Sequence, residues 1–267
     1  MKNLFFSCLT LLALLAVPSN ASAQFRIGGK KINTTKLLNA GKDMAAAITL
    51  SDEDIARLSR ESVAWMDAHN PVAADTTSYG ARLKRLTEGI TDADGLPLNF
   101  KVYLVTDVNA FACGDGSIRV FAALMDLMDD NELMAIIGHE IGHVVHADTK
   151  HAIKSAYLAS AARNAAGAAE GSTLAKLSDS QLGDVVTAFT DARFSQKQEY
   201  AADQYGFEFS VKHGFSPYAM AKSLEKLVDL SKGAKASFVE KMFSSHPDSE
   251  ARAARMREQA DAWQAAH

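Results

Sequence analysis

The feature that most constrains this chain is a pair of histidines separated by one helical turn, with a glutamate directly after the first. His139 and His143 lie in the apolar segment 131–146, whose hydrophobic residues recur at helical spacing and predict a core helix. Side chains four residues apart project from one helix face, so both imidazoles can bind a single zinc ion. Burying two imidazoles and a carboxylate in such a helix costs free energy unless they have a use. The pattern predicts one Zn²⁺ per chain, with structural histidines on an ordinary helix as the alternative.

Glu140 lies next to the two histidines and predicts acid–base chemistry at this site. A carboxylate beside the ion can take a proton from an attacking water and deliver it to a leaving amine. A catalytic zinc also needs a third protein ligand and one open position. His146 is unsuitable for this, because the helix rises about 10.5 Å between His139 and His146.

Glu199 is the better candidate for the third ligand, because Asp203 follows it by one helical turn. The first carboxylate can bind the metal while the second accepts the ring N–H of a ligating histidine and fixes its tautomer. Ala201 and Ala202 would let this helix approach the helix of His139 closely. A solvated acidic helix face is the alternative for this pair.

The rest of the pattern predicts an α+β fold that is mainly helical, with a small sheet in its first half. Alternating residues over 100–105 and a second run over 117–121 predict two strands, and the glycines within 109–116 permit a bend between them. Because helices follow the strands rather than alternate with them, a doubly wound parallel sheet is not expected. The expected helices include 51–70, 78–90, 131–146, 178–209, 216–230 and 248–265.

Residues 1–23 predict a cleaved signal peptide, with a basic start, an apolar run and a small-residue cleavage site. The apolar run of about fourteen residues is shorter than the roughly 20 needed to span a bilayer. A polar leader or arm over 24–48 and one catalytic domain over 49–267 would follow. We therefore expect export to the periplasm. Removal of Cys8 with the signal peptide would leave Cys113 as either a partly buried side chain or an exposed thiol.

Composition argues against one large class of partner. The formal net charge is −4, with 22% charged and 48% hydrophobic residues, so no broad basic surface is expected. Proteins that bind nucleic acid neutralise phosphates with clustered lysine and arginine, and this balance does not favour such a role.

Five motifs, in this order, resemble the gluzincin metallopeptidases related to HtpX, Oma and the CAAX prenyl proteases. Within that family the resemblance is greatest to the bacterial envelope branch represented by LoiP and BepA. The motifs are Asn109-Ala110-Phe111-Ala112, Ala122-Ala123-Leu124-Met125, His139-Glu140-x-x-His143, Glu199-x-x-Ala202-Asp203 and His246-Pro247-x-x-x-x-Arg252.

The resemblance implies a zincin-like metallopeptidase domain with zinc on His139, His143 and Glu199, and Asp203 behind a ligating histidine. It implies catalytic roles for Glu140, His246 and Arg252. The last two would stand across the cleft near the scissile carbonyl, or His246 would be an extra ligand in the resting state. A salt bridge of the C-terminal helix is the alternative for Arg252. The strand residues implied to form the sheet edge that binds an extended peptide are Ile118, Arg119, Val120 and Phe121.

The implied activity is that of a periplasmic zinc endopeptidase acting on unfolded or misassembled envelope proteins. A latent or chaperone-like module that binds peptides and cleaves little is the alternative, and a small-molecule zinc hydrolase is a third reading. The segment 21–23 lacks the lipid-bearing cysteine of LoiP-like proteins, so a lipid anchor in the outer membrane is not expected, whereas a peripheral association with the envelope or its outer membrane stays open.

Overall fold

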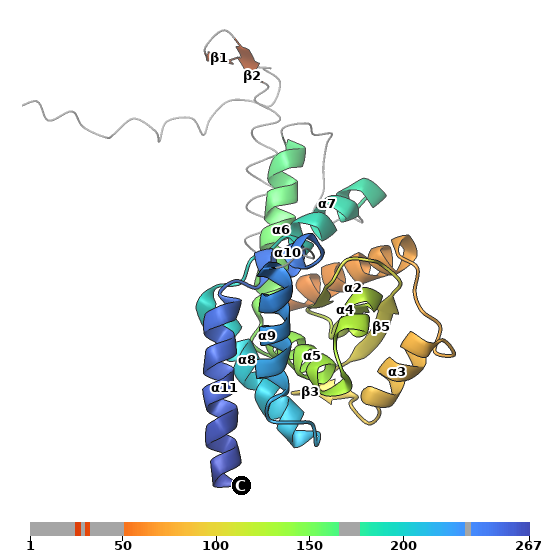
Figure 1. Cartoon of the computed structure of the whole chain (residues 1–267). Coiled ribbons are helices and arrows are strands. Elements are labelled where there is room, and N and C mark those ends of the chain that lie inside the picture. Colours follow the sequence, from red (N-terminus) through yellow and green to blue (C-terminus); the bar gives the residue numbers. More distant parts are fainter. Residues whose placement is uncertain (1–24, 28–29, 33–50, 166–176, 233–235) are drawn as a thin grey trace, which may run out of the picture.

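The computed structural model describes residues 25–27, 30–32, 51–165, 177–232 and 236–267 (Figure 1). The predicted signal peptide at 1–23 and most of the predicted leader at 24–48 lie outside these residues. Two short antiparallel strands, β1 (Phe25–Ile27) and β2 (Lys30–Ile32), fall within the leader. No helix of the described ranges is both long and apolar enough to cross a bilayer.

The described domain begins with two capped helices. α2 (Asp52–His69) starts at a capping box in which the Ser51 hydroxyl accepts the N–H of Asp54 and the Asp54 carboxylate bonds back to Ser51. α3 (Ser78–Leu86) begins at Thr77, whose hydroxyl accepts the N–H of Gly80. A short ribbon of β3 (Asp92–Ala93) and β4 (Leu96–Pro97) then leads into the sheet.

The sheet has three described strands in the order β5-β7-β6. β5 (Asn99–Tyr103) pairs in parallel with β7 (Ser117–Phe121), and β6 (Ala110–Ala112) pairs antiparallel with the opposite side of β7. The strands predicted over 100–105 and 117–121 therefore form.

One prediction about this sheet is wrong. Ile118, Arg119, Val120 and Phe121 lie on β7, which is the central strand and has partners on both sides, so they cannot offer an edge to a peptide. The edge strands are β5 and β6, and the sequence had placed β6 in a bend. β6 has only three residues, too few for an alternating pattern to be recognised.

The outer edge of β6 has no partner among the described strands. On its inner side, Phe121 donates to the Asn109 carbonyl and Cys113 donates to the Ser117 carbonyl. Backbone groups of an antiparallel strand alternate between its two sides, so the N–H and C=O groups of Ala110 and Ala112 face the free edge.

Two helices carry the three predicted metal ligands. They pack so closely on each other that larger side chains would not fit between them. α5 (Asp130–Val145) lies against α8 (Gln196–Lys212). A Cβ added at Gly142 would lie 3.0 Å from the Ala202 Cα, and one added at Gly206 would lie 2.9 Å from the backbone nitrogen of His139. The expected close approach at Ala202 is thus present, and small residues on both helices allow it.

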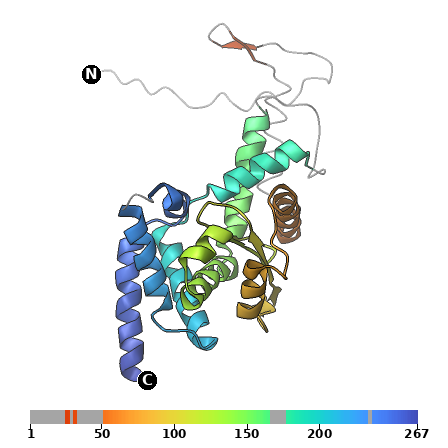
Figure 2. The same ribbon diagram turned by 45° about the vertical axis from the view of Figure 1, so that its right-hand side comes forward.

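α9 (Ala219–Lys232) packs against both helices, and α11 (Ser249–Ala266) runs along one side of the molecule, where it packs against α9 (Figures 1 and 2). α6 extends away from the sheet with α7 beside it. The predicted helix over 178–209 is two helices, because residues 191–195 break it, and α4 and α10 were not predicted. The bounds are α4 (Ala122–Leu127), α6 (Asp148–Ala165), α7 (Asp179–Thr190), α9 (Ala219–Lys232), α10 (Ala236–Ser245) and α11 (Ser249–Ala266).

A charged network ties α2 to the sheet. Asp67 accepts two hydrogen bonds from the buried Arg119 guanidinium, at 2.8 and 3.0 Å, and one each from Lys101 and Tyr103 at 2.7 Å. Although partial burial opposes ionisation, these donors lower the pKa of Asp67 to about 2. The Arg119 side chain is therefore used within the fold, where it joins the sheet to α2. Cys113 is buried and free, as the first of its two readings expected.

Candidate metal centre

Four buried side chains bring one ligand atom each to a common point: His139, His143, Glu199 and His246. The Nε2 atoms of His139 and His143 are 3.1 Å apart. The Glu199 carboxylate lies 3.7 Å from His139 Nε2 and 3.5 Å from His143 Nε2. The structure thus brings together the three predicted ligands, from α5 and α8, and His246, which the family resemblance implied as an extra ligand in the resting state.

These separations, which join His139 to Glu199 Oε2 and His143 to Glu199 Oε1, are close to those around a tetrahedral metal ion. Ligand atoms about 2.0–2.1 Å from one ion in a tetrahedron lie about 3.3–3.4 Å from each other. His246 Nδ1 completes the set, at 3.4 Å from His139 Nε2 and 3.1 Å from Glu199 Oε1. Two imidazoles and a carboxylate are a donor set that suits zinc, and His246 stands at the fourth corner.

Two carboxylates orient the histidine rings from behind. Asp203 Oδ1 lies 2.9 Å from His139 Nδ1, as predicted, and Asp148 Oδ2 lies 3.0 Å from His143 Nδ1. Asp148 is placed to accept the Nδ1 proton of His143, and Asp203 is a close charge partner of His139 Nδ1 without an aligned hydrogen bond to it. The two Nε2 atoms face one another across 3.1 Å, where a cation, either a proton or a metal ion, removes the repulsion between their lone pairs.

Electrostatics at the centre also favour a cation. Burial lowers the pKa of His139, which favours its neutral, ligating form. Although burial acts the same way on His143, the carboxylates of Asp148 and Glu199 raise its pKa to about 9. The imidazoles of His246 and His143 hold the pKa of Glu199 well below its usual range in spite of burial. The negative charge gathered here is suited to a divalent ion.

Arg252 lies behind the ligands rather than across an open cleft. Its guanidinium is buried, donates to both oxygens of Asp203 at 2.7 and 2.6 Å, and pairs with Glu199 Oε2. The placement near a scissile carbonyl is therefore not observed. The observed role matches the salt-bridge reading of Arg252, with the difference that its partners belong to the metal centre.

Glu140 points into a narrow space that we call the strand-edge groove. The groove is lined by Asn109, Ala110, Phe111, Ala112, Glu140, Thr149, Phe189, Thr190, Ala192, Phe194, Ser245 and His246. Glu140 is buried, and no described group donates a hydrogen bond to its Oε1, which lies 3.7 Å from His246 Nε2. Asn109 Oδ1 and Thr149 Oγ1 are likewise buried without a described partner. Three buried polar atoms without a described partner thus lie on one groove, where water or a polar ligand would satisfy them.

Asp148 and Phe194 are site residues that the sequence reasoning missed. Phe194 stacks on the His143 ring at a centroid distance of 3.9 Å. Asp148 returns to His143 because Ala147, at φ 61°, turns the chain just after α5. An aspartate shortly after the helix was a visible signal for Asp148, whereas Phe194 had none. His146 and His151 are exposed and outside the donor set.

Residues 78–260 match the family model described as peptidase family M48. The chain belongs to this family. The M48 match covers both helices of the metal centre and the sheet, so the two-helix site is that of a metalloprotease.

Relatives of the M48 chain carry the same activity in their names. It is 37% identical to Metalloprotease YcaL of Escherichia coli (strain K12) over 85% of this chain and 88% of that protein. It is 38% identical to Metalloprotease LoiP of the same organism over 88% of this chain and 92% of that protein. Against the beta-barrel assembly-enhancing protease of the same organism it is 29% identical, over 69% of this chain and 38% of the other.

Proposed function

We propose that this metalloprotease is a periplasmic zinc endopeptidase that cleaves unfolded or misassembled envelope proteins. The observation that carries the proposal is the buried Glu140 carboxylate, whose Oε1 accepts no described hydrogen bond and which lines one groove with β6 and His246. A zinc ion on His139, His143 and Glu199 would supply Lewis-acid chemistry, polarising water and the peptide carbonyl.

The chain's own residues would divide the remaining work. Glu140 Oε1 would accept the proton of the attacking water and pass it to the nitrogen of the leaving amine. Asp203 and Asp148 would keep both histidine rings in their ligating tautomer. Arg252 would balance the charge of Glu199 from the side away from the groove.

Substrate would bind by adding a strand to β6, in place of the β7 edge expected from the sequence. The outward backbone groups of Ala110 and Ala112 can bond an extended chain of any sequence. Their small side chains allow close approach. An unfolded protein offers such free backbone, whereas a folded one has it paired, which supports a preference for unfolded substrates.

The predicted signal peptide supports a periplasmic location, and the relative whose name refers to beta-barrel assembly supports envelope proteins as substrates. Fractionation of a bacterium that expresses the full chain would test the location. We expect to recover a mature form that begins at Gln24 from the periplasmic fraction. A cytoplasmic protein that still carries residues 1–23 would contradict the proposed location.

The activity is tested by substituting Glu140 with glutamine. Glu140→Gln should reduce cleavage of unfolded casein by at least a hundredfold while zinc content stays at one per chain. Glu88→Gln, at an exposed position after α3, is the matched control and should cleave as the unaltered protein does. Retained cleavage by Glu140→Gln at equal zinc content would refute the mechanism.

A latent, peptide-binding state is supported by the position of His246. Its Nδ1 stands where a fourth ligand would, so the corner needed by water is closed in this conformation. If the resting protein is latent, His246→Ala should raise the cleavage rate. If His246 instead assists the reaction, the same substitution should lower it.

A further inference from the structure

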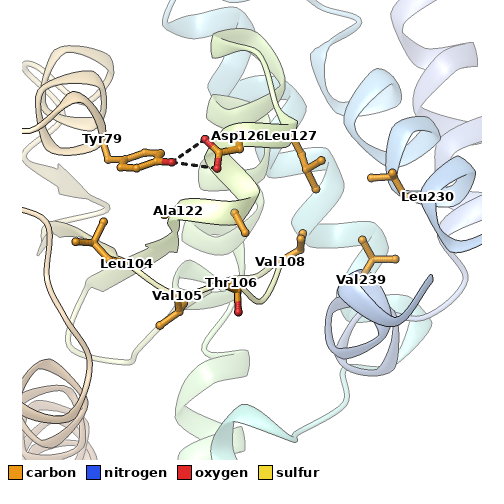
Figure 3. A pocket seen from close by; sticks show the side chains of 11 residues that line it. Tyr79, Leu104, Val105, Thr106, Val108, Ala122, Asp126, Leu127, Leu230 and Val239 are labelled. Carbon is orange, nitrogen blue, oxygen red and sulfur yellow. Dashed lines mark hydrogen bonds between the residues drawn. The ribbon is translucent and has the colours of Figure 1, made fainter. Parts of the chain in front are cut away.

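A second and larger hollow, which we call the apolar pocket, is shown in Figure 3. Its volume is about 490 Å³, within the range of small-ligand sites. None of the four metal donors is among its described lining residues. The side chains that line it are Tyr79, Leu104, Val105, Thr106, Val108, Ala122, Ala123, Asp126, Leu127, Leu230 and Val239.

The lining selects for an apolar occupant. It is aliphatic apart from Thr106, Tyr79 and Asp126, and the Tyr79 hydroxyl donates to the Asp126 carboxylate at 2.9 and 3.0 Å (Figure 3). Asp126 is the single charged residue of the described lining, so an acidic group entering here would be repelled. Leu104 remains 42% exposed, which leaves a large apolar side chain in water until something covers it.

Two segments of the chain each contribute residues to both the apolar pocket and the strand-edge groove. On one side Val108 lines the pocket and Asn109, the next residue, lines the groove. On the other side α10 contributes Val239 to the pocket and Ser245 to the groove. Six residues of helix span about 9 Å, which an extended peptide covers in about three residues.

We propose that the apolar pocket binds a large aliphatic or aromatic side chain of the substrate, about three or four residues from the bond that is cleaved. This rests on the proposed peptidase function, in which the peptide pairs with β6. The backbone of β6 would bind any extended chain, and the pocket would add a demand for one apolar residue. Unfolded proteins expose such residues, whereas soluble, polar linkers lack them.

The test uses fluorogenic peptides that differ at one position, three or four residues from the cleaved bond on either side. Leucine or phenylalanine there should give kcat/KM about ten- to a hundredfold above aspartate. Leu104→Asp and Ala123→Phe should each lower kcat/KM for the leucine and phenylalanine peptides to about the value that the unaltered protein has for the aspartate peptide, the first by placing a charge in the pocket and the second by filling it. Neither residue belongs to the metal centre, so the zinc content of both variants should stay at one per chain.

Val72→Asp is the matched control for Leu104→Asp. Val72 is also an exposed large apolar residue, 36% exposed, but it does not line the pocket. It should keep the preference for leucine and phenylalanine. The proposal would be overturned if kcat/KM for the leucine peptide were equal in the Leu104→Asp and unaltered proteins. So would a dimer that Leu104→Asp dissociates with the preference intact, since the pocket would then bind a second copy.

The proposal for the apolar pocket and the proposal of peptidase activity can be tested separately. If the zinc-loaded protein cleaves no peptide, the peptidase proposal fails, and binding of the same labelled peptides to the Glu140→Gln variant decides the pocket by fluorescence anisotropy. Tighter binding of the leucine peptide, lost in Leu104→Asp, would support the pocket. Equal binding of leucine and aspartate peptides would reject it.

Discussion

Arg252 donates two hydrogen bonds to Asp203, 2.7 and 2.6 Å long, on the side of the metal centre away from the strand-edge groove. Asp203 in turn lies 2.9 Å from His139, and a third guanidinium nitrogen pairs with Glu199. One arginine therefore holds two of the three predicted ligands in place. We interpret it as a positioning residue, because its contacts are with ligands and their partner.

Arg252→Lys should weaken zinc binding, because a lysine cannot form the planar two-bond fork. The dissociation constant for zinc, measured by chelator competition, should rise about 10–100-fold, and kcat/KM at limiting zinc should fall in proportion. Arg255→Lys on the same helix is the control, since Arg255 lies over the Tyr200 ring and contacts no ligand. Unchanged zinc affinity with lost cleavage would instead indicate that Arg252 contacts substrate.

Asp148→Asn should also lower zinc affinity, because the amide is a weaker acceptor for the Nδ1 proton of His143. Partners of this kind typically change metal affinity by about 10–100-fold. Asp229→Asn, an exposed position on α9, should leave affinity unchanged. Equal affinity in both variants, measured by the same competition, would show that His143 keeps its orientation without the carboxylate.

Gly206→Ala should disturb the contact between α5 and α8. The added Cβ would lie 2.9 Å from both the Ala135 carbonyl oxygen and the His139 nitrogen, so the helices must separate. Overpacking of this kind costs roughly 1–3 kcal/mol of unfolding free energy, and the shift should also loosen the zinc ligands. Glu208→Ala, exposed on α8, controls for helix propensity. Thermal denaturation with and without zinc measures both effects, and a Gly206→Ala protein as stable as the control would contradict this account.

The metal ligands were predictable from the sequence because their signals are local. His139 and His143 share one helix face, and Glu199 and Asp203 share another, so spacing alone placed each pair. The sheet edge was not predictable, because the position of β6 outside β7 depends on a pairing that no local pattern in 110–112 reveals. The position of Arg252 behind Glu199 could not be predicted for the same reason, since it depends on how α11 packs against α8.

Acid should remove the contribution of Asp67 to stability. Its folded pKa of about 2 lies below the ordinary value, so the charged carboxylate stabilises the fold above about pH 4, and this stabilisation is lost as the pH falls toward 2. The partial exposure of the network reduces the expected contribution to about 1–2 kcal/mol. Urea unfolding of the metal-free protein at pH 5 and pH 3 would measure it without interference from zinc release.

Asp67→Asn separates this carboxylate from the others that titrate in acid. At pH 5 the variant should be less stable by about 3 kcal/mol, because Arg119 stays buried without its counter-charge. At pH 3 the unfolded chain of the unaltered protein takes up a proton at Asp67 while the folded protein still holds the charge, so the gap between the two proteins should narrow by about 1 kcal/mol. A gap that stays constant from pH 5 to pH 3 would mean that Asp67 titrates normally and that Arg119 is held by its bonds to the backbone carbonyls of Asn99 and Ile118.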